Sequence, residues 1–337
     1  MKVSELGEFG LIDFLARMVD GSPDNRIASR QQLLIGIGDD AAAWCGDTST
    51  QLATIDSFIE DVHFSLKTTP WAELGWKALA ASVSDITAMG GLPKYALVTL
   101  ALPAHTEVED VAALYKGMIE MTQQFGVAIV GGDVSNAPLV AITVAVFGGT
   151  GRRDEQMLTR SAAEVGERVA VTGYLGAAAS GLKMLTERLR FDPETVAYLR
   201  GAFLHPCPRI AEGQLLAGEG VKAAIDISDG LVSDLRHICR ASRVGARIEV
   251  DRVPVHPAVK ANFGDESLAL ALSGGEDYEL LFTASTEVMD RVRKAGSCPI
   301  TVIGEIVADR IGEVTLVDSQ GDIFDLDKVG WDHFTPK

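Results

Sequence analysis

The stretch Leu34-Ile35-Gly36-Ile37-Gly38-Asp39-Asp40-Ala41-Ala42 contains the pattern around which the rest of the chain is organised. The mostly apolar run 33–37 is typical of a short buried strand, and two adjacent carboxylates follow it. Adjacent side chains on an extended backbone point to opposite faces, so Asp39 and Asp40 cannot share one environment. Carboxylates at the end of a buried strand are costly unless a cation or hydrogen-bond donors satisfy them.

The same pattern recurs along the chain. Acidic residues follow or interrupt apolar runs at Asp56, Asp85, Asp133, Asp226, Asp229, Glu276 and Asp277. Asp85 falls on an expected helix over 72–89, on the same inner stripe as Ser82 and Ile86. We therefore expect these acids to converge on divalent metal ions.

One competing motif is rejected. The residues Gly36, Gly38 and Ala41 formally match the dinucleotide-binding fingerprint. The two positions that would lie near a pyrophosphate are Asp39 and Asp40, which would repel it. The segment 44–49 is typical of a turn rather than of the long helix that the fingerprint requires. With Mg²⁺ between the acids and a phosphate, however, the repulsion becomes a binding site.

Composition limits the class of protein. The chain has 337 residues, 47% hydrophobic and 23% charged, as expected for one large or two ordinary globular domains. Lys+Arg 30 against Asp+Glu 47 gives a net charge of −17, which argues against binding to nucleic acid or anionic membranes. The four cysteines lie far apart, which disfavours a zinc site or a disulfide framework. Without a signal peptide or a membrane-spanning run, the sequence predicts a cytoplasmic protein.

The order of elements predicts two domains. Strands and helices alternate in the first half, with strands expected over 51–56, 95–102, 127–130 and 139–147 and a second helix over 108–125. The Gly- and charge-rich segment 148–155 is the expected boundary, so we predict domains at 1–150 and 151–337. In the second half, His237 on an expected helix over 233–242 is interpreted as structural.

Missing motifs narrow the chemistry. The sequence contains no Gly-Lys dipeptide, no Gly-x-Ser-x-Gly and no His-Glu-x-x-His, so it lacks the P-loop lysine, the nucleophile elbow and the zinc-protease motif. A chain rich in carboxylates and glycines suits phosphoryl transfer, which needs positioning and charge neutralisation more than a covalent nucleophile.

Several short motifs in a fixed order resemble a known family. They are Gly7-Glu8-Phe9, Ile37-Gly38-Asp39-Asp40, Asp56 through His63-Phe64, Ser84-Asp85-Ile86-Thr87-Ala88-Met89-Gly90, Gly131-Gly132-Asp133, Leu158-Thr159-Arg160-Ser161, Asp226-Ile227-Ser228-Asp229-Gly230-Leu231 and Ser273-Gly274-Gly275-Glu276-Asp277-Tyr278-Glu279-Leu280. Over nearly its whole length the chain resembles the thiamine-monophosphate kinases, of the aminoimidazole-ribonucleotide (AIR) synthetase-like superfamily.

The resemblance implies a fold and an activity. The fold is an α+β N-terminal domain, whose mixed sheet and helices form a homodimer interface, and an α/β C-terminal domain that closes over the cleft. The activity is the last step of thiamine diphosphate biosynthesis: a direct transfer of the ATP γ-phosphate to thiamine monophosphate, assisted by several Mg²⁺ ions. No nucleic-acid or membrane partner is implied.

The resemblance also implies site residues. The matching metal positions are Asp40, Thr54, Ile55 through its backbone, Asp56, Asp85, Asp133, Asp226 and Asp229, with Asp40, Asp85 and Asp133 catalytic. The nucleotide positions are Tyr115, Gly132, Asp133, Arg160 and Ser228, and the acceptor positions are His63, Glu276 and Trp331. Taken alone, His63 suits a capping role, while Tyr115 and Trp331 suit core packing. The segment Gly151–Met157 is longer than the family pattern.

Two other classes stay open. The first is another superfamily enzyme, such as a purine-pathway synthetase, a selenophosphate synthetase or the hydrogenase-maturation dehydratase. The selenium enzyme requires an N-terminal reactive cysteine and the maturation enzyme a C-terminal one, whereas this chain has Cys45 after the acids and ends in Lys337. The second is a non-catalytic nucleotide- or metal-binding module, which the full set of acids in both halves disfavours.

Overall fold

The computed structural model describes residues 1–21, 31–37, 41–46, 48–151, 157–326 and 330. The chain divides into two compact units. Unit 1 comprises Met1–Ile86 and Leu92–Asp154, and unit 2 comprises Thr87–Gly91 and Glu155–Lys337. The five residues from Thr87 to Gly91 therefore belong with the second half of the chain, although they lie inside the first half of the sequence.

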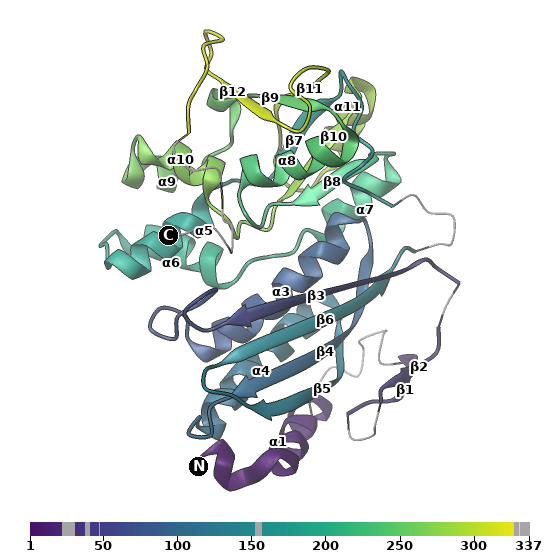
Figure 1. The fold of residues 1–337 in the computed structure, drawn as a ribbon, viewed down its shortest axis with the longest axis vertical. Helices are drawn as coiled ribbons and strands as arrows, with labels where there is room; N and C mark the ends of the chain where they lie inside the picture. Colours follow the sequence, from purple (N-terminus) through teal and green to yellow (C-terminus); the bar gives the residue numbers. More distant parts are fainter. Residues whose placement is uncertain (22–30, 38–40, 47, 152–156, 327–329, 331–337) are drawn as a thin grey trace. The chain divides into compact units, whose positions relative to one another are not determined.

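A four-stranded sheet forms the centre of unit 1 (Figure 1). Its strands, in spatial order, are β3 (Gln51–Ile59), β6 (Ala141–Gly149), β4 (Leu92–Leu102) and β5 (Ala128–Asn136). β6 is antiparallel to both neighbours, and β4 is parallel to β5. β3 and β5 are thus the two edge strands, and both carry candidate site residues.

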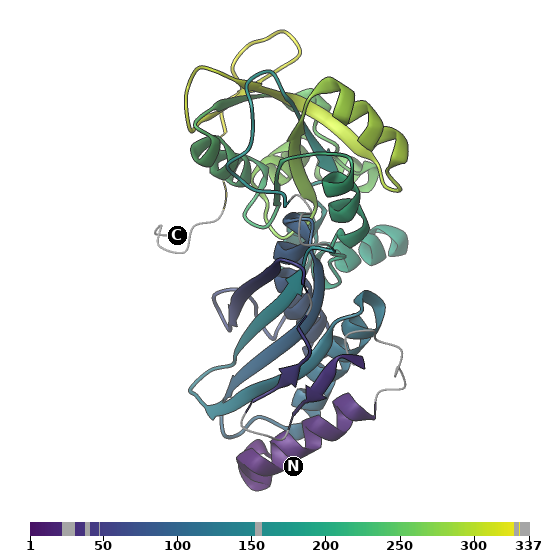
Figure 2. The same ribbon diagram turned by 90° about the vertical axis from the view of Figure 1, so that its right-hand side faces the viewer.

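The alternation along β4 and β6 separates the two faces of this sheet. In β6, Ile142, Val144 and Val146 are fully buried, while the residues between them are half-exposed. The buried face is covered by α3 (Trp71–Ala88) and α4 (Val108–Phe125), as Figures 1 and 2 show. Ser82 Oγ of α3 donates a hydrogen bond to the Val144 carbonyl at 3.2 Å, which joins the helix to the sheet.

Glycines set how closely α3 and α4 approach. A Cβ atom on Gly75 would lie 1.9 Å from the Leu114 carbonyl oxygen, and one on Gly117 would lie 1.8 Å from that of Ala72. Only hydrogen fits at these two positions. The smaller elements of the unit are α1 (Val3–Asp20), which packs on α4, and the paired strands β1 (Leu33–Ile35) and β2 (Ala43–Trp44).

Unit 2 is a six-stranded mixed sheet with helices. The strands, in spatial order, are β12 (Val314–Val317), β9 (Gly245–Glu249), β11 (Ile300–Val307), β7 (Arg168–Thr172), β10 (Leu280–Ala284) and β8 (Ala223–Asp226). The helices are α5 (Ala177–Glu187), α6 (Pro193–Leu204), α7 (Ile210–Gly218), α8 (Leu231–Ser242), η1 (Val250–Arg252), α9 (Pro257–Phe263), α10 (Glu266–Ser273) and α11 (Thr286–Ala295). Every strand pair is antiparallel except β12 with β9.

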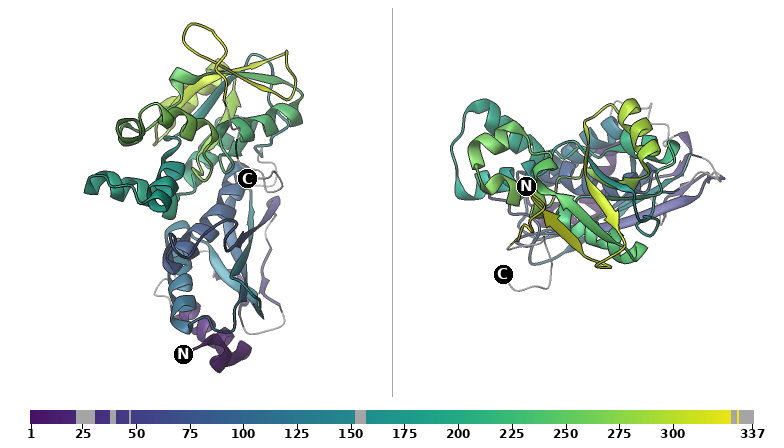
Figure 3. Two further views of the ribbon diagram at one scale, coloured as in Figure 1. Left: turned by 60° about the vertical axis from the view of Figure 1, so that its left-hand side comes forward. Right: turned by 90° about the horizontal axis from the view of Figure 1, so that it is seen from above.

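Two neighbouring strands of unit 2 are buried on both faces. β10 and the edge strand β8 have no exposed residue, as expected for strands that are covered on both sides. α5 and α6 lie against each other as a helical pair (Figure 3). Among the helices that the structure describes, none combines the length and the apolar character needed to cross a membrane.

Candidate active site

Three predicted metal residues meet in unit 1. Thr54 and Asp56 lie two residues apart on β3, so both face the helices, and Asp85 lies on α3. Thr54 Oγ1 donates a hydrogen bond to Asp85 Oδ2 at 2.5 Å. The structure therefore brings together two segments that are separated by 31 residues in the sequence.

The Asp56 carboxylate is suited to a cation. Its Oδ2 atom is buried and has no hydrogen-bond partner within the described part of the chain. Burial raises the pKa of Asp56, and the charge of Asp85 raises it further, while a hydrogen bond from Ser82 opposes the rise. Two neighbouring carboxylates with one unsatisfied oxygen form an oxygen donor set of the kind that Mg²⁺ prefers.

The neighbours of these residues differ in orientation. Ile55 lies between Thr54 and Asp56 with its side chain 66% exposed on the opposite face of the sheet, so only its backbone is available as a ligand. His63 follows β3, and its Nδ1 atom accepts a hydrogen bond from the Ile59 N–H at 3.0 Å. This bond gives His63 a local structural role and leaves Nε2 as the nitrogen that can serve as a donor.

The predicted nucleotide residues of unit 1 are spread over two elements. Gly132 and Asp133 are exposed on β5, where a Cβ atom on Gly132 would lie 1.8 Å from the Val98 carbonyl oxygen. β5 is separated from β3 by two strands, and the register of the sheet aligns Asp133 with Ser57 rather than with Asp56. Three strand spacings, about 14 Å, separate Asp133 from β3. Tyr115 is buried in α4, and burial raises the pKa of its hydroxyl.

A tight loop after β8 carries the corresponding residues of unit 2. Asp226 ends the strand and is 2% exposed, and the loop then runs through Ser228 and Asp229 to Gly230. Asp234, in the first turn of α8, accepts hydrogen bonds from the backbone N–H groups of these three loop residues at 3.0–3.1 Å. A single side chain thus fixes the backbone that presents Ser228 and Asp229.

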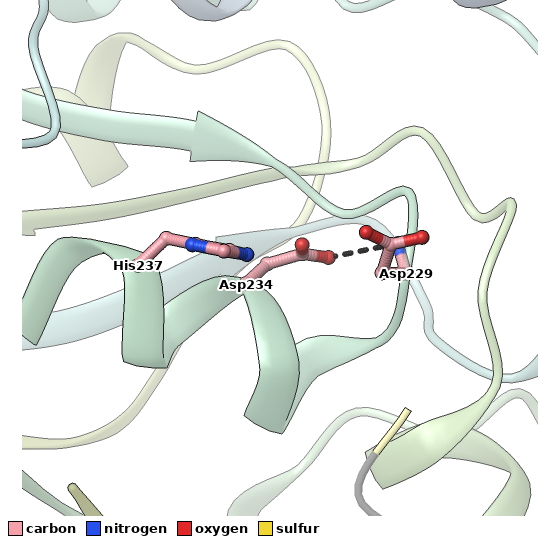
Figure 4. Close-up of side chains that lie close together, drawn as sticks. All are labelled: Asp229, Asp234 and His237. Atoms are coloured by element: carbon pink, nitrogen blue, oxygen red, sulfur yellow. Dashed lines mark hydrogen bonds between the residues drawn. The ribbon is translucent and has the colours of Figure 1, made fainter. Parts of the chain in front are cut away.

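Asp229, Asp234 and His237 lie side by side, as Figure 4 shows, with ligand atoms all within 4.8 Å of one another. Burial raises the pKa of Asp234 to about 8, and the carboxylates of Asp226 and Asp229 contribute to the rise. Burial lowers the pKa of His237, and the nearby Arg160 guanidinium lowers it further. The loop therefore concentrates negative charge beside an exposed arginine, an arrangement that suits a phosphate held with cations.

Glu276 is connected directly to this loop. Its backbone N–H donates a hydrogen bond to the Ser228 carbonyl at 2.8 Å, and the Tyr278 N–H donates to the Ile227 carbonyl at 2.9 Å. Glu276, predicted to bind the phosphate acceptor, is therefore connected within unit 2 to Ser228, predicted to bind the nucleotide.

Two predicted site residues, Asp40 and Trp331, lie outside the described residues, as does most of the lengthened segment Gly151–Met157. Their roles stay predictions. Asp234 was not predicted from the sequence, and His237 was interpreted as structural. The available signal was an acid in the first helical turn after an acidic loop, where a carboxylate can accept free backbone N–H groups.

Comparison with known proteins identifies the family. Residues 38–150 match the N-terminal domain of the AIR synthase related proteins, and residues 164–317 match their C-terminal domain. The thiamine-monophosphate kinase of Salmonella typhimurium is 38% identical over 339 residues, covering 97% of this chain and 98% of that protein.

Solved structures agree with this result. The thiamine-monophosphate kinase from Stenotrophomonas maltophilia superposes with a TM-score of 0.79 at 31% identity, covering 93% of this chain and 96% of that one. A structure described as AaThiL complexed with AMPPCP and TMP superposes with a TM-score of 0.76 at 31% identity, covering 99% of both chains. The predicted AIR-synthetase-like fold of two domains is confirmed. The chain belongs to the thiamine-monophosphate kinase family of the AIR synthase related proteins.

Proposed function

We propose that this chain is an ATP-dependent kinase that phosphorylates thiamine monophosphate to thiamine diphosphate. The observation that carries the proposal is the hydrogen bond from the Glu276 N–H to the Ser228 carbonyl. This bond connects the residue expected to bind the phosphate acceptor to the loop expected to bind the nucleotide. Similarity to thiamine-monophosphate kinases supports the proposal, since three such proteins are 36–38% identical to this chain.

We further propose that Mg²⁺ serves as the metal. In unit 1 the residues that would hold it are Thr54, Asp56 and Asp85, and the unsatisfied Asp56 oxygen fits a cation. In unit 2 they are Asp226 and Asp229. We assign Asp40 and Asp133 to the same role from the family pattern. When bound to these oxygen ligands, Mg²⁺ would neutralise the negative charge of the phosphate groups.

The protein's own residues would mainly position the reactants. Arg160 is exposed beside the acidic loop, where its guanidinium can bind phosphate oxygens. In unit 2, Ser228, fixed through Asp234, would contact the nucleotide, and Glu276 would pair with the amine or the cationic ring of the phosphate acceptor. From the family pattern we assign Tyr115 and Gly132 to nucleotide binding, and His63 and Trp331 to acceptor binding. Phosphoryl transfer of this kind needs no covalent intermediate on the protein.

We also propose a homodimer formed by unit 1. The sheet face opposite α3 and α4 mixes apolar residues such as Ile55 and Ala145 with the bonded pair Ser57 and Thr143, and Ile55 is 66% exposed there. The exposed apolar side chains on this face would be stabilised by a second layer that covers them. The predicted cytoplasmic location agrees with four free cysteines, which persist in a reducing compartment.

The experiment is a product assay with several acceptors. Purified protein is incubated with ATP, Mg²⁺ and thiamine monophosphate, thiamine or no acceptor, and the products are separated by chromatography. The proposal predicts thiamine diphosphate and ADP in equal amounts with thiamine monophosphate alone. Equal ATP turnover with and without the acceptor would contradict it.

A further inference from the structure

The segment that carries Glu276 has an unusual backbone. Glu276 and Tyr278 have φ angles of 68° and 50°, in the left-handed region that non-glycine residues seldom occupy. Such conformations persist only where the surrounding structure holds them, and they gather at binding sites. The contacts that hold this segment therefore determine the orientation of Glu276.

Two sets of contacts hold the segment, one through its backbone and one through the Asp277 side chain. The backbone N–H groups of Glu276 and Tyr278 donate to the loop after β8, as described above. Between them, the Asp277 side chain reaches the N-terminus of α5. Its Oδ2 accepts the Gly176 N–H at 2.7 Å, and its Oδ1 accepts the Ala178 N–H at 3.2 Å.

These contacts make Asp277 a link between two elements. Both carboxylate oxygens are used, each on a backbone N–H that α5 itself leaves free. Because Glu276 and Asp277 are adjacent, fixing the Asp277 side chain fixes the peptide between them. It thereby fixes the direction in which the Glu276 side chain leaves the backbone.

We propose that Asp277 is a positioning residue for the phosphate acceptor, acting through Glu276 from the N-terminus of α5. The proposal rests on the proposed function, since the acceptor role of Glu276 belongs to it. Asp234 holds the adjoining nucleotide loop through three N–H groups. Asp277 thus holds the segment of Glu276, and Asp234 holds the nucleotide loop. Variants of the two aspartates should therefore change KM for different reactants.

The chain offers a matched control. Asp192 is the N-cap residue of α6, and its Oδ1 accepts the N–H groups of Glu194 and Thr195 at 3.1 and 3.0 Å. It is exposed and belongs to no part of the proposed site. Asp192→Ala removes this acceptor, so it reports the effect of weakening a helix cap of unit 2 without disturbing Glu276.

The experiment measures KM for ATP and for thiamine monophosphate separately, with melting temperatures, in wild type, Asp277→Ala, Asp277→Asn, Asp234→Ala and Asp192→Ala. Loss of both Asp277 bonds should raise KM for thiamine monophosphate about tenfold and change KM for ATP less than about threefold. Asp277→Asn, which keeps one acceptor oxygen, should lie between Asp277→Ala and wild type. Asp234→Ala, which removes the acceptor of three loop N–H groups, should instead raise KM for ATP, and Asp192→Ala should lower the melting temperature without changing either KM.

The outcomes separate this proposal from the function on which it rests. Wild type that forms no thiamine diphosphate would overturn both. With active wild type, equal changes in the two KM values of Asp277→Ala, or a lower melting temperature with both KM values unchanged, would overturn the positioning role alone. If Asp277→Ala does not fold, the same comparison made on Asp277→Asn decides the question.

Discussion

Asp56 shows at the scale of one residue why this protein should need a cation. Its Oδ2 atom is buried without a partner beside the Asp85 carboxylate. In the absence of metal the two carboxylates repel each other, so the site is maintained at a cost to stability. This cost is typical of a binding site, where the residues are arranged for the ligand rather than for the free protein.

The corresponding prediction concerns Asp56→Asn. Without metal the variant should melt at the wild-type temperature or above it, because one repulsive charge is gone. In wild type, Mg²⁺ at roughly 100 times its Kd should stabilise the fold by about 2.7 kcal/mol, and this increment should shrink in the variant. Thermal melting with and without Mg²⁺ measures both effects. An unchanged Mg²⁺ increment would exclude Asp56 as a ligand.

A second prediction at this scale concerns Gly132. The Cβ atom of Gly132→Ala would meet the Val98 carbonyl, so β5 must shift away from β4. We expect a loss of about 1–3 kcal/mol in the free energy of unfolding, measured by urea denaturation. Gly201→Ala, on α6 with open space around the new methyl group, is the control and should stabilise the protein by about 0.5–1 kcal/mol. Equal stability of the two variants would contradict the close strand approach.

At the scale of elements, a partly buried ion pair joins Arg209, at the start of α7, to Glu279, just before β10. Arg209 Nε donates to Glu279 Oε2 at 2.7 Å, Nη2 donates to Oε1, and Thr172 Oγ1 also donates to Oε2 at 2.7 Å. Glu279 directly precedes β10 and follows the Glu276 segment, so the pair holds the strand that this segment enters.

Removing one partner of this pair should be costly. Arg209→Ala leaves the buried Glu279 carboxylate without its cation, and we expect a loss of about 3–5 kcal/mol in the free energy of unfolding. The control is Arg168→Ala, whose pair with Glu305 is exposed on both sides and should cost at most about 1 kcal/mol. Similar denaturation midpoints for the two variants would show that the Arg209–Glu279 pair contributes no more to stability than the exposed Arg168–Glu305 pair.

The elements also show what sequence can predict and what it cannot. The helices over 72–89 and 108–125 were predicted almost to the residue, because their apolar periodicity records which face packs on the sheet. The strands expected to end at Asp56 and Val130 instead continue to Ile59 and Asn136. The end of an apolar run marks where burial ends, whereas backbone pairing with β6 and β4 continues beyond it.

For the candidate site, the structure shows that Thr54 bonds Asp85 and that Asp85 lies near Asp56, while the metal-binding role of these residues stays a prediction. The supporting role of Asp234 was not predicted, because a contact with backbone N–H groups depends on how a helix begins in space rather than on an apolar pattern. The bonds of Asp277 to α5 connect residues about a hundred positions apart, and periodicity carries no information on such pairs.

At the scale of the whole molecule, we expect two chains to associate through the open face of the unit 1 sheet. Sedimentation velocity at micromolar concentration should show a dimer. Ala145→Arg, which places a charge at the middle of that face, should shift the protein toward monomer. Ile311→Arg, at an exposed apolar residue of unit 2, is the control and should leave the dimer intact. A monomeric wild type would exclude this interface.

The proposed direct transfer of phosphate from ATP to thiamine monophosphate is measured most directly by following the γ-phosphate. ATP labelled at the γ-phosphate is mixed with Mg²⁺, thiamine monophosphate and an excess of the protein, and the label is traced through a single turnover. Direct transfer predicts that the label appears in thiamine diphosphate at the rate at which ADP forms, with none bound covalently to the protein. Label released as inorganic phosphate, with no labelled thiamine diphosphate, would contradict the account.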